Sequence, residues 1–113
     1  MQIASRLEGK VLVISITGEL MAGQDSDHLR NIIDEAIKDE HIEVVADMKG
    51  VAWMNSSGLG MLISALTSLR SAGGDLKLAN LSDRIRRPMQ ITKLDTVFQD
   101  FTSVQEAVSS YAN

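Results

Sequence analysis

The stretch that decides the fold reads Val45-Ala46-Asp47-Met48-Lys49-Gly50-Val51-Ala52-Trp53-Met54-Asn55-Ser56-Ser57-Gly58-Leu59-Gly60-Met61-Leu62. Apolar and β-branched residues predict a buried strand over residues 42–47, and the segment after Asp47 predicts a loop. A helix is expected to begin near Ser57, because apolar residues then recur at steps of three and four, at Leu59, Leu62, Ile63, Leu66 and Leu69. A strand, a loop and a helix in direct succession are typical of an α/β fold.

The flanking sequence extends this alternation in both directions. Toward the N-terminus we expect strands over residues 2–7 and 10–17, joined by a tight turn at Glu8-Gly9, and then a helix capped by Ser26. Toward the C-terminus Gly73-Gly74 is expected to end the central helix. Beyond it we expect strands at 76–79 and near 97–98, a helix around 83–92, and a last helix that opens with the capping box Ser103-Val104-Gln105-Glu106.

Strands that alternate with helices predict parallel pairing through right-handed crossovers, and the opening hairpin adds an antiparallel pair. The predicted fold class is therefore α/β, with a mixed sheet of four or five strands packed against about four helices. Residues 1–113 are expected to form a single domain, because a chain of this length supports one hydrophobic core.

The composition argues against several classes of site and partner. The chain has no cysteine, which excludes disulfides and thiolate chemistry, and its net charge of -4 disfavours nucleic acid. It shows neither a signal-peptide pattern nor a run of about 20 apolar residues, so we expect a cytoplasmic protein without a membrane partner. One basic cluster is either a solvated helix face or a docking patch for an acidic partner; it consists of Arg84, Arg86, Arg87 and Lys93.

No catalytic residue, cofactor or metal site is expected. A serine hydrolase needs the pattern G-x-S-x-G, whereas Met54 stands two residues before Ser56. The histidines His28 and His41 lack the spacing of metal ligands and are interpreted as surface residues. The glycine patterns of common nucleotide sites are missing, and a weaker nucleotide site at the Gly58 helix end is the remaining alternative.

The helix start near Ser56 has two interpretations. Asn55, Ser56 and Ser57 are all good N-cap residues, and a serine there most often serves only as a cap. The N-terminus of a helix also carries free N–H groups and a partial positive charge, so a hydroxyl at this place could instead carry a phosphate. Gly58 and Gly60 could allow close packing of the helix on the sheet.

The whole chain resembles the STAS family of bacterial anti-sigma factor antagonists. Thr17-Gly18-Glu19-Leu20 matches an early family turn, and Gly73-Gly74-Asp75-Leu76-Lys77-Leu78 matches a glycine turn into the following strand. The most specific match runs from Asp47 to Ser56-Ser57-Gly58-Leu59-Gly60, on the family signature D-L-x-x-V-x-x-(I/M)-D-S-S-G-L-G.

The resemblance implies a regulatory protein that is switched by phosphorylation. It places the phosphate on Ser56, with Ser57 as the alternative acceptor, and implies a serine kinase or anti-sigma factor of the histidine-kinase-like ATPase type as partner. A metal-dependent phosphatase would remove the phosphate. The partner is expected to bind the unphosphorylated form, through Met21, Trp53, Met54, Asn55, Ser57, Gly58 and Leu59.

Two departures from the family pattern bear on partner choice. Asn55 stands where the family has an aspartate, which keeps a capping oxygen but removes a charge beside the acceptor. Met21 replaces the aspartate that usually follows the T-G-E-L motif. The output is either a sigma factor or another pathway, such as biofilm or secretion control, lipid transport or a stress scaffold.

Trp53 also has two interpretations. It either packs beneath the serine segment, which is the stretch that carries Ser56 and Ser57, or lies exposed as an aromatic anchor for the partner.

Overall fold

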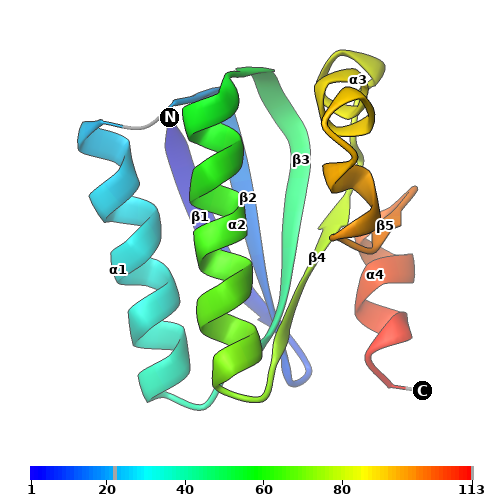
Figure 1. Ribbon diagram of the computed structural model, residues 1–113. Coiled ribbons are helices and arrows are strands. Elements are labelled where there is room, and N and C mark those ends of the chain that lie inside the picture. Colours follow the sequence, from blue (N-terminus) through cyan, green and yellow to red (C-terminus); the bar gives the residue numbers. More distant parts are fainter. Residues whose placement is uncertain (22, 113) are drawn as a thin grey trace.

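The computed structural model describes residues 1–21 and 23–112 of the chain. The elements follow in the order β1 (Gln2–Glu8), β2 (Val11–Leu20), α1 (Gln24–Lys38), β3 (Glu43–Met54), α2 (Ser56–Ser71), β4 (Asp75–Ala79), α3 (Asp83–Ile91), a short 3-10 turn η1 (Leu94–Thr96), β5 (Asp100–Phe101) and α4 (Val104–Ser110). Figure 1 shows these elements as one sheet with helices on both of its faces. Among the described residues, none of the helices has the length and apolar character needed to cross a bilayer.

The sheet has five strands in the order β1-β2-β3-β4-β5. β1 pairs with β2 in antiparallel fashion, and the remaining neighbours are parallel. The chain therefore has the predicted α/β class, with a mixed sheet and the predicted opening hairpin.

The two faces of the sheet bury separate hydrophobic cores. The larger core lies under α1, α2 and α3, where Leu29, Leu62 and Ile85 pack on strand residues such as Val44 and Ala46. The smaller core lies under α4, where Ala107 packs with Val11, Val13, Val45 and Ala79. Neighbouring residues of one strand point to opposite faces, which is why Val44 and Val45 belong to different cores.

The segment predicted as a loop after Asp47 is a continuation of β3, so the predicted strand end was wrong. β3 runs to Met54 because β2 is also longer than predicted and pairs with it as far as Leu20↔Met54. Two register shifts, between Ser15 and Thr17 and between Gly18 and Glu19, absorb extra β3 residues. Irregularities of this kind bend a strand without ending it. In the sequence, however, the polar pair Lys49-Gly50 has the composition of a loop.

Two further boundaries differ from the prediction. The fifth strand is Asp100–Phe101 rather than residues 97–98, because Phe98 is buried in the larger core. The first helix begins at Gln24, and Gly23 with φ 143° occupies its cap position. Ser26 is thus not the cap; its hydroxyl donates a 2.6 Å hydrogen bond to the carbonyl of Gly23.

The two glycines after α2 act as predicted. Gly73 has φ 92°, and its N–H donates to the carbonyl of Arg70, while the N–H of Gly74 donates to that of Leu69. This pair of bonds is a Schellman motif, which satisfies the last carbonyls of a helix and reverses the chain. α2 therefore ends at Ser71, and the chain turns directly into β4, which begins at Asp75.

Candidate functional site

The ends of two parallel strands bring distant parts of the sequence together. In the β2–β3 register Glu19 pairs with Trp53 and Leu20 pairs with Met54. Met21, which follows β2, is therefore close in the fold to the residues that precede α2. The T-G-E-L residues 17–20 are the end of a strand rather than a turn, and they pair with the end of β3, just before the two serines.

Asn55 is the N-cap of α2. Its backbone is extended, and its side-chain oxygen accepts a 2.8 Å hydrogen bond from the N–H of Gly58. The carbonyl of Asn55 accepts the first helical bond, from the N–H of Leu59. Because Asn55 fills the capping role, the hydroxyl of Ser56 is not needed for it.

Ser56 and Ser57 are the first two residues of α2, and both are exposed. Within the described part of the chain, neither hydroxyl makes a hydrogen bond, and neither backbone N–H donates to a protein acceptor. The first turn of α2 contains no acidic residue. The helix start therefore offers free donors and the positive end of the helix dipole, with no carboxylate in that turn to oppose an anion.

Gly58 lets α2 approach the end of β2 closely. A Cβ at this position would overlap the carbonyl oxygen of Leu20 and would come within 3.2 Å of the Met54 side chain. Gly60, in contrast, has no neighbouring atom within 4 Å of such a Cβ. The close-packing interpretation therefore holds for Gly58 alone.

The expected partner-contact residues divide into an exposed and a buried group. Trp53 is 42% exposed and Ser57 is exposed, whereas Asn55 and Met21 are half-buried. The other three, Met54, Gly58 and Leu59, are buried beneath the helix start. In this structure these three residues are therefore not available to a partner, and they hold the exposed residues in place from below.

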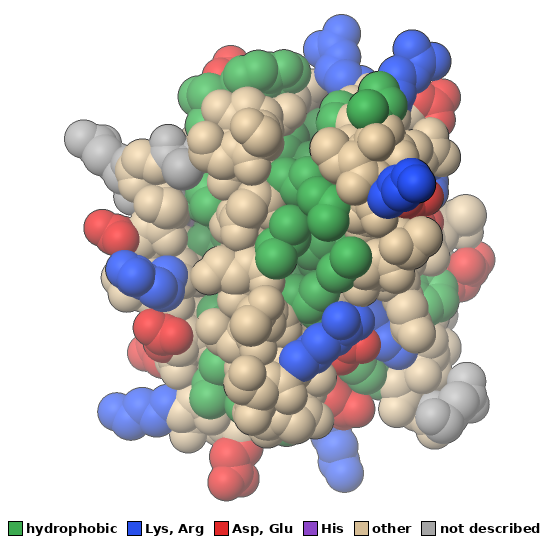
Figure 2. All heavy atoms as spheres, viewed as in Figure 1, with side chains coloured by type: hydrophobic (Ala, Val, Ile, Leu, Met, Phe, Trp, Pro, Cys, Tyr) green, Lys and Arg blue, Asp and Glu red, His purple; other side chains and the backbone are tan. Residues whose placement is uncertain are grey.

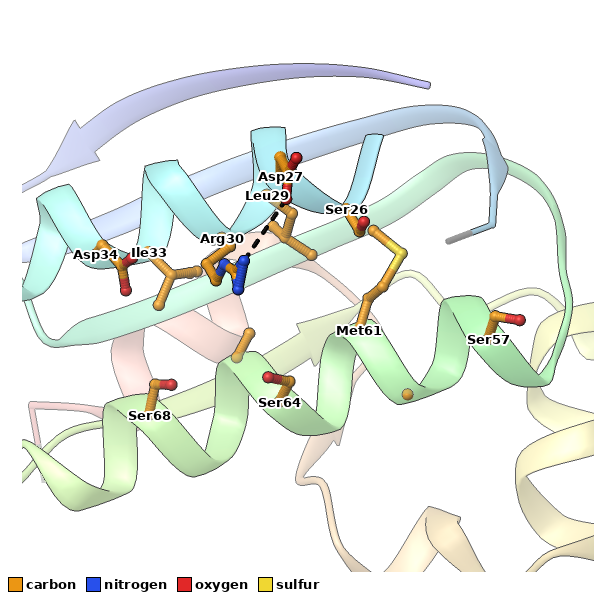
Figure 3. A pocket seen from close by; sticks show the side chains of 12 residues that line it. Ser26, Asp27, Leu29, Arg30, Ile33, Asp34, Ser57, Met61, Ser64 and Ser68 are labelled. Carbon is orange, nitrogen blue, oxygen red and sulfur yellow. Dashed lines mark ion pairs between the residues drawn. The ribbon is translucent and has the colours of Figure 1, made fainter. Parts of the chain in front are cut away.

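A groove between α1 and α2 adjoins this site and was not predicted. It encloses about 310 Å³, and Figure 3 shows Ser57, Ser64 and Ser68 along its α2 side, with Arg30 and Asp27 on the α1 side. Apart from Met61, the α2 side is lined by small residues that recur at helical spacing, at Ser57, Gly60, Ser64, Ala65 and Ser68. This spacing is visible in the sequence and was the signal that could have revealed the groove.

The described residues include no group of three or more His, Asp or Glu side chains placed to hold a metal ion. His28 lies on α1 and His41 precedes β3, so the structure places them in different segments. No contact links either histidine to the serine segment among the hydrogen bonds of the described chain.

Comparisons of this chain with a family model and with known proteins point to the same family. The model of the STAS domain matches residues 2–107. The anti-sigma F factor antagonist of Paenibacillus polymyxa is 28% identical over 95 residues, which are 83% of this chain and 80% of that protein.

Two solved structures share the fold. An anti-sigma factor antagonist from Mycobacterium paratuberculosis has a TM-score of 0.84 at 22% identity, over 99% of this chain and 94% of that one. The Bacillus cell fate determinant SpoIIAA in its phosphorylated form has a TM-score of 0.75 at 23% identity, over 97% and 99% of the two chains.

Proposed function

The chain belongs to the STAS domain family, and we propose that it is a phosphorylation-switched regulator of the anti-sigma factor antagonist type. Ser56 is the proposed phosphate acceptor. In the unphosphorylated state the protein binds a kinase-type partner, and phosphorylation releases it. The exposed Ser56 hydroxyl, left free because Asn55 caps α2, is the observation that carries the proposal.

The proposal assigns no catalytic step to this chain. The phosphoryl group comes from ATP bound by the partner kinase, and a separate metal-dependent phosphatase removes it. Both reactions and the partner complex are proposed to take place in the cytoplasm. A related fold is known with phosphate attached, in the structure of SpoIIAA in its phosphorylated form.

The helix start supports a phosphate on Ser56 without a change of fold. A phosphoserine brings about -1.5 to -2 charge and three acceptor oxygens. The free N–H groups of Ser56 and Ser57 and the dipole of α2 would favour that charge by roughly 0.3–1 kcal/mol at an exposed position. The asparagine at position 55 adds no like charge beside it.

The same charge would be unfavourable in a protein interface. A partner surface that fits a neutral hydroxyl would face an unpaired and desolvated dianion, at a cost on the order of 2–5 kcal/mol. This corresponds to a loss of affinity of about 30- to several-thousand-fold. The switch is thus proposed to act across the interface rather than through the fold.

Trp53 is proposed as the main anchor of the partner. It is one of three large hydrophobic side chains exposed among the described residues, and it lies two residues before the Asn55 cap. Aromatic residues are over-represented among interface residues that dominate binding energy. Met21 and Ser57 complete the proposed contact surface on either side.

The test is phosphorylation by candidate kinases with ATP, with the modified residue located by mass spectrometry. We expect phosphate on Ser56, no phosphate in Ser56→Ala, and unchanged phosphorylation in Ser57→Ala, the matched control one residue away. Ser56→Ala should keep its partner affinity and Ser56→Asp should lose at least tenfold of it. Phosphate located only on Ser57, or equal partner affinity of the Ala and Asp variants, would refute the assignment.

A further inference from the structure

The charge of the chain is divided unevenly between α3 and the rest of the molecule. Residues 83–93 hold four of the 11 basic residues and one of the 15 acidic residues, so this segment carries +3. The remaining residues hold seven basic and 14 acidic residues and carry -7. Figure 2 shows Lys and Arg side chains gathered beside hydrophobic ones at the upper right, where Figure 1 places α3.

The outer face of α3 combines these charges with apolar surface. Arg87 and Pro88 are three and four residues after Arg84, and Ile91 is four and three residues after them, so all four lie on one side of the helix. All four are exposed, whereas Ile85 and Met89 on the inner side are buried in the larger core. A shallow hollow on the outer side is lined by Asp83, Arg84, Arg87, Pro88, Ile91 and Thr92.

The cations on this face are not used by the fold. The side chains of Arg84, Arg87 and Lys93 make no ion pair or hydrogen bond with any described residue. Arg86 differs, because its guanidinium lies 3.1 Å from both carboxylate oxygens of Asp100 and ties α3 to β5. Arg86 therefore has a structural partner, while the other three remain available.

Ile91 is the most exposed large hydrophobic residue of the described chain. It is 75% exposed, compared with 51% for Leu7 and 42% for Trp53. A single exposed isoleucine is ordinary on a protein surface. Here it shares a hollow with two unpaired arginines and the ring of Pro88, so an apolar anchor point lies beside two cations, with Asp83 as the one carboxylate in the lining.

We propose that this outer face of α3 is a docking surface for an acidic, amphipathic segment of a partner protein. An apolar side chain of the segment covers Ile91 and Pro88, and its carboxylates pair with Arg84, Arg87 and Lys93. Arginine is suited to this role because its planar guanidinium pairs with a carboxylate through two parallel hydrogen bonds. The surface is separate from Ser56, and the inference does not rest on the proposed phosphorylation.

A short acidic segment fits this surface better than an extended polyanion does. The molecule measures 31 × 29 × 23 Å, so a membrane or nucleic acid laid against α3 would also approach parts of the remaining -7. A peptide segment meets Asp83 as the one carboxylate lining the hollow, against Arg84 and Arg87, and screening over about 8 Å at physiological salt limits repulsion from the rest. Lys93, two residues beyond the C-terminal end of α3, adds a further positive charge.

The test uses an end-blocked, fluorescently labelled 16-residue peptide with alternating glutamates and two leucines on one helical face. Binding is followed by anisotropy at low and at physiological salt. We expect saturable binding that Arg84→Glu/Arg87→Glu weakens at least tenfold and Ile91→Ser weakens roughly fivefold or more. Amide shifts in two-dimensional NMR should be confined to residues 83–93 and their neighbours.

Matched variants elsewhere on the surface serve as controls. Lys10→Glu/Lys38→Glu makes the same change in net charge at exposed sites, and Leu7→Ser removes another exposed apolar side chain. Both should leave peptide affinity within about twofold, and so should Ser56→Asp.

Four outcomes would overturn the docking proposal. They are peptide binding unaffected by the α3 variants, no binding at low salt, binding of anionic phosphatidylglycerol vesicles instead of the peptide, and a self-association in sedimentation experiments that Ile91→Ser abolishes. None of them bears on whether Ser56 is phosphorylated, so failure of this proposal and of the proposed function are distinguishable.

Discussion

At the scale of single residues, Asn55 decides what the serine pair is free to do. Its side chain satisfies the N–H of Gly58, and this leaves the Ser56 hydroxyl without a structural partner among the described residues. An asparagine and an aspartate both supply the capping oxygen. The asparagine does so without a negative charge. The positive end of the helix dipole can therefore attract an anion without opposition from the cap residue.

Replacement of Asn55 tests this role. Asn55→Ala should lower the free energy of unfolding by about 1 kcal/mol, because it leaves the Gly58 N–H without its acceptor. Asn55→Asp should be neutral to slightly stabilising at pH 7, and this advantage should disappear below about pH 4 as the new carboxylate is protonated. Urea unfolding at both pH values measures these differences. Equal stability of the Ala and Asn proteins would show that the bond contributes nothing.

Replacement of Gly58 and of Gly60 by alanine should change the free energy of unfolding in opposite directions. Gly58→Ala places a methyl group against the Leu20 carbonyl, and we expect a loss of about 3 kcal/mol in unfolding free energy. Gly60→Ala meets only open space in the interior of a helix and should stabilise by about 0.5–1 kcal/mol. Thermal and urea unfolding of the pair would check this, and destabilisation by Gly60→Ala would contradict the geometry.

At the scale of elements, α4 is joined to the sheet by a polar contact within the smaller core. The Tyr111 hydroxyl lies 2.7 Å from the carbonyl of Val44 and 2.9 Å from that of Asp75, and it accepts from the N–H of Val44 at 3.2 Å. Lys77 lies under the same helix, with its Nζ 4.0 Å from the centre of the Tyr111 ring and 2.7 Å from the Ser110 hydroxyl. These contacts fix α4 against β3 and β4.

Tyr111→Phe should weaken this contact without changing the packing of the ring. We expect a loss of about 1–3 kcal/mol in unfolding free energy, because backbone groups at the strand ends lose their partner. Ser109→Ala, on the exposed side of the same helix, should change it by less than about 0.5 kcal/mol. Hydrogen exchange should be fastest in α4 of the Phe variant. Uniform exchange across all helices would argue against a separate anchoring role.

The same residue predicts a loss of stability in alkali. Burial, followed by the negative charge of Asp75, raises the pKa of Tyr111 above its ordinary value of about 10. Above that pH the unfolded chain releases the phenol proton while the folded chain retains it, so the free energy of unfolding falls by up to about 1.4 kcal/mol per pH unit. Tyr111 is the only tyrosine, so the difference between wild type and Tyr111→Phe isolates it. Parallel pH profiles of the two proteins would contradict the assignment.

Helices with clear caps and regular apolar spacing were predictable from the sequence, and irregular strands were not. Ser103 accepts from the N–H of Glu106 as the capping box predicts, although the Glu106 carboxylate accepts a bond from Thr102 instead of turning back to Ser103. The end of β3 was missed because its register shifts depend on β2, a partner far away in sequence. The cap at Gly23 was missed because a glycine has no side chain that could be recognised as a cap, and its positive φ is not visible in the sequence.

The same distinction holds for the candidate site. The serine pair and its place at a helix start were visible in the motif and in the helical period that follows it. Burial of Met54 and Leu59 was not, because it depends on how α2 approaches the end of β2 over Gly58. Local signals identify a site, whereas tertiary contacts decide which of its residues reach the surface.

At the scale of the whole molecule, the question is whether a phosphate on Ser56 acts through the fold or at the surface. Ser56 lies outside both hydrophobic cores, and the hydrogen bonds of the first turn of α2 run through Asn55, Gly58 and Leu59. Nothing in the described contacts transmits a change at the hydroxyl to the sheet. The domain should therefore keep one structure in both states.

The unmodified and the Ser56-phosphorylated protein should therefore be equally stable. We expect the free energies of unfolding to agree within about 1 kcal/mol, with the same denaturant dependence, because the dianion meets free N–H groups and no nearby carboxylate in the first turn of α2. Amide shifts should stay near the start of α2 and the end of β2, while partner affinity falls at least 30-fold. A reduced denaturant dependence, or shifts that spread to β4 and α4, would mean that the phosphate loosens the domain itself and that release of the partner follows from unfolding.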